Sequence, residues 1–134
     1  MSSFTQPLTV TKLPKGLWIT ERAFDYRVGK EVLCEVIHIP KGRISDGASI
    51  PKFVWSIVGH PMDEYAQGAF IHDDLYTRKI HTRKRSDQIF LESMKVLNDA
   101  GYNVPLWKRR VIYRSLRMFG WYAWRKKIKQ ETSL

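Results

Sequence analysis

The chain has little cysteine, no long apolar run and no leader-like start, and each absence excludes a class of protein. Its 134 residues include one cysteine, Cys34, which excludes an internal disulfide and a zinc site built from cysteines. Residues 1–10 show no basic segment followed by an apolar core, so no signal peptide is expected. No apolar run approaches the roughly 20 residues that span a bilayer. We therefore expect synthesis and use in the cytoplasm, unless an assembly carries the protein elsewhere.

Acidic residues are missing from a long segment near the C-terminus. The net charge is +10, and residues 105–130 contain nine Lys or Arg and no Asp or Glu. Such a block can meet nucleic acid, an anionic membrane surface or an acidic protein, and charge alone does not choose between them. On a helical wheel its arginines share an outward face, opposite an apolar face with Trp107, Val111, Leu116, Met118, Phe119 and Tyr122. The candidate partner-binding residues are Arg109, Arg110, Arg114, Arg117, Arg125, Lys126 and Lys127.

The composition, with 43% hydrophobic and 13% aromatic residues, predicts one globular domain over residues 1–134. Apolar and polar residues alternate in 8–13 and 17–29, and 31–40 is rich in Val and Ile, so residues 8–45 should form a small antiparallel sheet. An α-rich part, 52–125, and a basic tail, 126–134, should follow. The fold class is therefore α+β, a sheet first and helices after. We expect helices over 52–58, 63–78 and 83–98, and a long one from Pro105.

A histidine and several acids lie where the helix pattern is otherwise apolar. At about 100° per residue, Tyr65, Ala69, His72 and Tyr76 form one line, with Asp73 at its edge and Asp74 pointing to solvent. Asp87 lies on the inward stripe of the next helix. Because a short turn should make the two helices antiparallel, His72 and Asp87 could face one another. A carboxylate on one imidazole nitrogen orients the ring and leaves the other nitrogen to take a proton from water. The alternative is a structural His–Asp bond that locks the helices together.

Four segments, "SDGASIPKFVWSIVG", "IHDDLY", "RSDQIFLESM" and "RRVIYRSLRMFG", together resemble a phage and prophage family, the domain of unknown function 1353. The resemblance covers about residues 8–120, and Ser86 stands where the family usually has Ala. It implies a phage-encoded protein, made in the host cytoplasm, that either remains there or joins the virion through other virion proteins. The family brings no settled activity.

The histidine helix pair is also distantly similar to that of phospholipase A2. That resemblance implies a base at His72, a calcium ligand at Asp73 and an orienting acid at Asp87, and places Tyr76 at the substrate. Leu75 and Ser86 replace the paired cysteines, and the glycine-rich calcium loop is missing, although Asp46 in "SDGAS" could supply a ligand instead. The resemblance therefore implies a His–Asp hydrolase with or without a metal, the candidate metal being a divalent ion such as calcium or zinc.

Two main hypotheses follow from these residues. The first is a phage-encoded His–Asp hydrolase, metal-assisted or not, acting on an ester, an amide or a phosphodiester. The second is a non-catalytic virion or assembly protein with a structural His–Asp cluster and a partner-binding basic segment. A nucleic-acid accessory protein ranks third, because no recognised reading motif is present.

Overall fold

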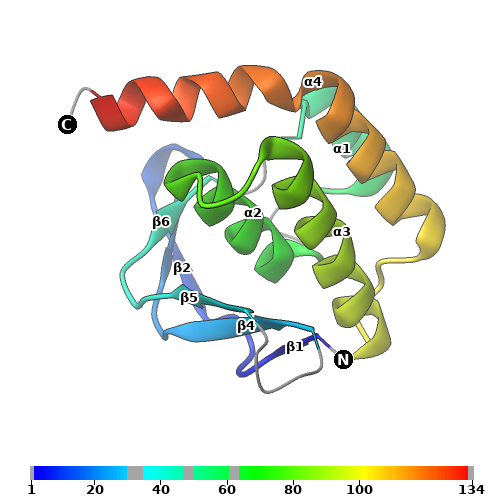
Figure 1. Ribbon diagram of the computed structural model, residues 1–134. Helices are drawn as coiled ribbons and strands as arrows, with labels where there is room; N and C mark the ends of the chain where they lie inside the picture. Colours follow the sequence, from blue (N-terminus) through cyan, green and yellow to red (C-terminus); the bar gives the residue numbers. More distant parts are fainter. Residues whose placement is uncertain (1, 30–34, 47–49, 61–63, 133–134) are drawn as a thin grey trace.

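The computed structural model describes residues 2–29, 35–46, 50–60 and 64–132, with only the backbone of 127–132. Short strands precede the helices (Figure 1), so the predicted α+β class is confirmed. Cys34 lies outside the described residues. The strands are β1 (Ser3–Phe4), β2 (Val10–Lys12), β3 (Trp18–Thr20), β4 (Phe24–Val28), β5 (Glu35–Ile39) and β6 (Ile44–Ser45), with a 3-10 turn at Pro14–Gly16.

The strands form two antiparallel sheets, with the orders β1-β4-β5 and β2-β3-β6. The prediction of one sheet is wrong in this respect, because β3 and β4, expected within one alternating segment, belong to different sheets. The Thr20 hydroxyl holds the chain where β3 ends. It donates to the Pro40 carbonyl at 2.7 Å and accepts from the Arg43 amide at 2.9 Å. The chain therefore leaves the second sheet after β3, and β4 starts a new pairing with β5.

The helices are α1 (Lys52–Val58), α2 (Ala66–Arg78), α3 (Arg83–Asp99) and α4 (Leu106–Thr132). The C-cap of α2 is Lys79, which adopts a left-handed conformation. The N-cap of α3 is Thr82, whose side chain accepts from the Arg85 amide at 3.1 Å. Helix α4 continues to Thr132, so the tail predicted for 126–134 is helical as far as 132. The physical reason is that no glycine or proline follows Gly120 to end it.

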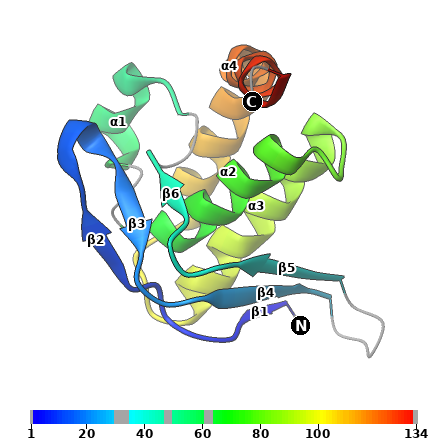
Figure 2. The ribbon, with the colours of Figure 1, turned by 90° about the vertical axis from the view of Figure 1, so that its left-hand side faces the viewer.

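Helices α2 and α3 lie between the β1-β4-β5 sheet on one side and α4 on the other (Figures 1 and 2). One apolar cluster joins the sheet to the helix pair: Phe24, Tyr26, Val28, Ile37, Ile39, Phe70, Ile71, Leu75 and Ile89. A second joins the four helices: Ile50, Val54, Val58, Tyr65, Ala69, Phe90, Met94, Leu97, Val104, Ile112 and Leu116. Every residue of α2 from 66 to 76 is therefore buried.

Asp74 is one of these buried residues, so its predicted place in solvent is wrong. It is 1% exposed, and its carboxylate is paired with Arg43 and with Arg78, the latter at 2.7 Å. Arg43 belongs to the connection from β5 to β6, and it reaches the side of α2 that the wheel had assigned to solvent. The two guanidinium groups compensate the charge that burial would otherwise penalise.

Over the described part of the chain, no helix is both long and apolar enough to cross a membrane.

Candidate active site

His72 of α2 and Asp87 of α3 meet between the two helices. Nε2 of His72 lies 2.8 Å from Oδ1 of Asp87, and both side chains are 0% exposed. The prediction that the helix pair brings these two groups face to face is confirmed. The close approach of the helices depends on Gly68, because a Cβ there would lie 2.6 Å from Oγ of Ser93.

The Asp87 carboxylate also binds groups from two other directions. The Tyr76 hydroxyl donates to Oδ1 at 2.6 Å, and Nη1 of Arg117 donates to Oδ2 at 2.7 Å. A second guanidinium, that of Arg83, lies 3.8 Å from Oδ2. Arg83 in turn donates to the Leu116 carbonyl at 2.9 Å. One carboxylate therefore ties together α2, α3 and α4.

These contacts set the protonation of the network. Burial acts to raise the pKa of Asp87, but the hydrogen bonds from His72, Tyr76 and Arg117 outweigh burial and lower that pKa. The carboxylate is therefore ionised at neutral pH. Burial, with the negative charge of Asp87 beside it, raises the pKa of Tyr76. Its hydroxyl thus keeps the proton that it donates.

The other imidazole nitrogen is in a different situation. Within the described residues, Nδ1 of His72 is buried and has no hydrogen-bond partner. Because the ionised carboxylate accepts at Nε2, the neutral ring carries its hydrogen there and a lone pair on Nδ1. A second hydrogen on Nδ1 would be a buried donor without an acceptor, which is costly. The geometry thus selects the tautomer that a general base requires.

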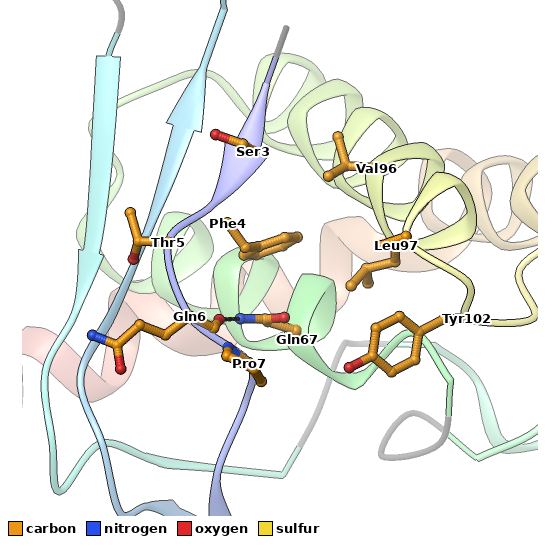
Figure 3. Close-up of a pocket in the computed structure, with 10 residues that line it drawn as sticks. Ser3, Phe4, Thr5, Gln6, Pro7, Gln67, Val96, Leu97 and Tyr102 are labelled. Carbon is orange, nitrogen blue, oxygen red and sulfur yellow. Dashed lines mark hydrogen bonds between the residues drawn. The ribbon is translucent and has the colours of Figure 1, made fainter.

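The ring is closed off from solvent. Its centroid lies 4.1 Å from that of Tyr76 and 4.9 Å from that of Phe90. A pocket of about 420 Å³ opens elsewhere, between the N-terminal segment and the end of α3 (Figure 3). There the Gln67 amide donates to the Gln6 carbonyl at 2.6 Å. His72 does not line this pocket, so it gives no access to the histidine.

Comparison with known proteins identifies the family. A model described as "Protein of unknown function (DUF1353)" matches residues 18–116. The chain belongs to the DUF1353 family. It is also similar to "Uncharacterized protein y4jT" of Sinorhizobium fredii (strain NBRC 101917 / NGR234), with 32% identity over 83 residues. That match covers 61% of this chain and 23% of the relative, so the chain spans about a quarter of the relative's length. No solved structure matches it significantly.

The DUF1353 chain does not assemble the predicted metal site from its described residues. Asp73 is 7% exposed, and Asp46 is exposed. No group of three or more His, Cys, Asp or Glu that could hold a metal occurs in the part of the chain that the structure describes. Residues 47–49, beside Asp46, lie outside it. The described residues therefore contain no complete ligand set for calcium or zinc.

Tyr76 was predicted to bind substrate, but its ring is fully buried and its hydroxyl is bonded to Asp87. Its contacts fit the positioning of Asp87. Arg83 and Arg117 also contact this carboxylate, and sequence reasoning gave neither of them a role there. A signal existed for Arg83, which lies one helical turn before Asp87 and can pair with it. None existed for Arg117, whose approach depends on how α4 crosses the helix pair.

The predicted basic face of α4 is wrong in two positions. Arg117 turns inward to Asp87, and Arg109 is partly buried, with Nε donating to the Val104 carbonyl at 3.0 Å. Conversely, several residues predicted to face the core are exposed: Trp107, Met118, Phe119 and Tyr122. The remaining predicted basic residues, Arg110, Arg114, Arg125 and Lys126, are exposed, and the side chain of Lys127 lies outside the described part. The wheel failed because it assigned apolar residues, Met118 among them, to the core by residue type.

Proposed function

We propose that this protein is a hydrolase in which His72 is the general base and Asp87 orients it. The observation that supports the proposal is the asymmetry of the imidazole. Nε2 is bonded to an ionised carboxylate, and Nδ1 has no hydrogen-bond partner within the described residues. A histidine that serves packing alone gains stability from satisfying both nitrogens. The bound Nε2 and the lone pair on Nδ1 are what proton abstraction requires.

The chemistry follows from this arrangement. Nδ1 takes a proton from water while the water oxygen bonds to a carbonyl carbon or a phosphorus atom, and the same proton then passes to the leaving group. The imidazolium formed in between is stabilised by the Asp87 carboxylate, as in other His–Asp pairs. Tyr76 and Arg117 keep that carboxylate in place. Because the His72 ring is fully buried, the proposal requires the side chains around Nδ1 to move before a substrate enters.

The substrate class proposed is an ester, an amide or a phosphodiester. On the motif resemblance, we further propose that the protein is encoded by a phage and made in the host cytoplasm, where a cell-envelope component would be a natural target. The exposed arginines of α4 would meet another virion protein, nucleic acid or an anionic surface.

One observation favours a second function, that of a non-catalytic assembly protein. His72 and Asp87 are fully buried, and the carboxylate links three helices. A network of this kind can specify how helices pack without doing chemistry. In that case the basic helix, rather than the histidine, would carry the function through a virion partner.

Hydrolysis of model esters, amides and phosphodiesters by the His72→Ala variant distinguishes the two. His81→Ala is the matched control, because Nε2 of His81 also pairs with a carboxylate, that of Glu35, at 2.7 Å. If the proposal holds, the wild type and His81→Ala hydrolyse one of these classes, and folded His72→Ala loses at least about a hundredfold in rate. Equal rates for folded His72→Ala and the wild type, or no hydrolysis by either, would favour the assembly protein. Circular dichroism and thermal unfolding establish that each variant is folded.

A further inference from the structure

The outward side of α4 has an unusual composition. Its 27 residues extend for about 40 Å at about 1.5 Å per residue. In both views α4 is the outermost element on its side of the described chain (Figures 1 and 2). The exposed side chains that share about a third of its circumference form what we call the outer face: Trp107, Arg110, Arg114, Met118, Trp121, Tyr122 and Arg125.

Apolar exposure on the outer face is large. Met118 and Tyr122 are each 65% exposed, although a single exposed apolar residue would be ordinary. Helix α1 extends the apolar surface, because Phe53 packs edge-on against Phe119 with ring centroids 5.6 Å apart, and Phe53 and Ile57 are exposed. A contiguous group of exposed apolar side chains marks an interaction site.

The charge of the outer face has one sign. None of the ion pairs among the described residues involves Arg110, Arg114 or Arg125. Arg125 instead lies over the Trp121 ring at 5.4 Å. No Asp or Glu occurs between residues 105 and 130. The partner of the outer face must therefore offer negative charge to the arginines and, beside it, an apolar environment to the exposed apolar side chains.

We infer that the outer face of α4, with the exposed edge of α1, docks on an anionic lipid surface. In a headgroup layer, Trp and Tyr rings lie at the boundary with the acyl chains, and arginines bind phosphates at the same level. Arginines and apolar side chains are interspersed along the outer face, with arginines near both of its ends, and this mixture fits such a layer. The inference does not depend on hydrolysis.

Two other partners fit less well. A protein interface has an apolar centre surrounded by a polar rim, whereas the arginines here are spread along the helix. Nucleic acid could use the arginines and stack on Trp121 or Tyr122. It offers nothing to the aliphatic Ile57 and Met118, which a lipid surface accommodates.

Flotation of the full-length chain with vesicles tests this inference. The wild type should bind vesicles of mixed phosphatidylcholine and phosphatidylglycerol and not vesicles of phosphatidylcholine alone. Arg114→Glu/Arg125→Glu should reduce binding at least about tenfold, because each cation near an anionic surface contributes substantially. Arg27→Glu/Lys41→Glu removes the same charge from exposed positions away from α4 and should bind like the wild type.

An apolar variant tests the second half of the inference. Met118→Ser/Trp121→Ser should weaken vesicle binding about tenfold, and Val36→Ser/Ile80→Ser, at other exposed apolar positions, should not. The inference is overturned if the wild type does not float, or if both charge variants lose binding equally. It is also overturned if the apolar variant binds vesicles like the wild type, or if duplex DNA or RNA binds more tightly than the vesicles and displaces them.

Discussion

Helices α2 and α4 place polar and apolar side chains in opposite ways. Helix α2 buries His72, Asp73 and Asp74, whereas α4 exposes Trp121 and Tyr122. Both arrangements are unfavourable unless something compensates them. For His72 and Asp74 the compensation lies within the molecule, in the Asp87 carboxylate and in the guanidinium groups of Arg43 and Arg78. The rings of α4 stay exposed against the described part of the chain, and we propose that a lipid surface covers them.

The difference teaches where function can be sought in a protein of unknown activity. A buried polar network is compatible with chemistry or with packing, and only the unsatisfied atom, Nδ1 of His72, separates the two. The exposed apolar face of α4 has no packing explanation within the described residues. The first feature therefore has to be tested against fold stability, and the second can be tested by surface substitutions that leave the core intact.

The largest effect is expected from Asp87→Asn, which removes the negative charge at the centre of the buried network. Arg117 and Arg83 would lose their shared counter-ion, and breaking a buried pair in this way costs about 3–5 kcal/mol. Asp99→Asn removes an exposed partner of Lys95 and should cost less than about 1 kcal/mol. Urea unfolding followed by circular dichroism measures both.

The same pair of variants has a pH signature. Because the pKa of Asp87 is lowered in the folded state, its contribution to stability is complete above the ordinary carboxyl pKa of about 4. That contribution is lost as the pH falls through the folded-state pKa. Asp87→Asn should therefore flatten the acid limb of the stability curve, and Asp99→Asn should not. An unchanged acid limb in Asp87→Asn would show that the carboxylate is not the hub of the network.

A smaller effect is expected from Gly120→Ala, which tests how tightly α4 closes on α2. A Cβ at residue 120 would lie 2.8 Å from the Tyr76 hydroxyl and 3.2 Å from Nη1 of Arg83. The clash should outweigh the roughly 1 kcal/mol gained in helix propensity and destabilise the fold by about 1–3 kcal/mol.

Tyr76→Phe, which removes the closer of those two atoms, provides the control for Gly120→Ala. In a double-mutant cycle the cost of Gly120→Ala should be lower in the Tyr76→Phe background. Equal costs in the two backgrounds would place the strain elsewhere.

The smallest effect concerns alkaline pH. The pKa of Tyr76 is raised by burial and by Asp87, so its contribution to stability is present below the ordinary tyrosine pKa of about 10. It is lost as the pH rises towards the folded-state value. Tyr76→Phe should cost about 1 kcal/mol at neutral pH and make stability fall less steeply above pH 10. Tyr26→Phe should act similarly, because burial and Glu92 raise the pKa of Tyr26.

The sequence predicted correctly the features that depend on the local residue pattern, such as helix boundaries. The helix of residues 52–58 and the start of α3 at residue 83 are as expected, because a proline before α1 and a threonine cap before α3 mark them. The His72–Asp87 contact was also predictable, since helical spacing put both residues on inward stripes and a short turn joined the helices. Strands of two residues, β1 and β6, are too short for alternation to reveal.

What the sequence could not predict depends on tertiary crossings. Asp74 is buried because Arg43 reaches it across 31 positions of sequence, and no periodicity reports such an approach. Arg117, predicted to lie on the basic face of α4, likewise turns to Asp87, 30 positions away. A helical wheel assigns each residue to a buried or an exposed face. In α2 and α4, residues assigned to the exposed face contact neighbouring parts of the chain.

The hydrogen bond from Arg117 to Asp87 also bears on where the folding unit ends. The segment shared with the family stops at residue 116, one position before the arginine that completes the carboxylate's partners. A fragment cut there would keep the histidine, the tyrosine and both helices of the pair but lack the guanidinium bound at 2.7 Å. The boundary of the family match therefore falls just before a residue that binds the buried carboxylate of Asp87.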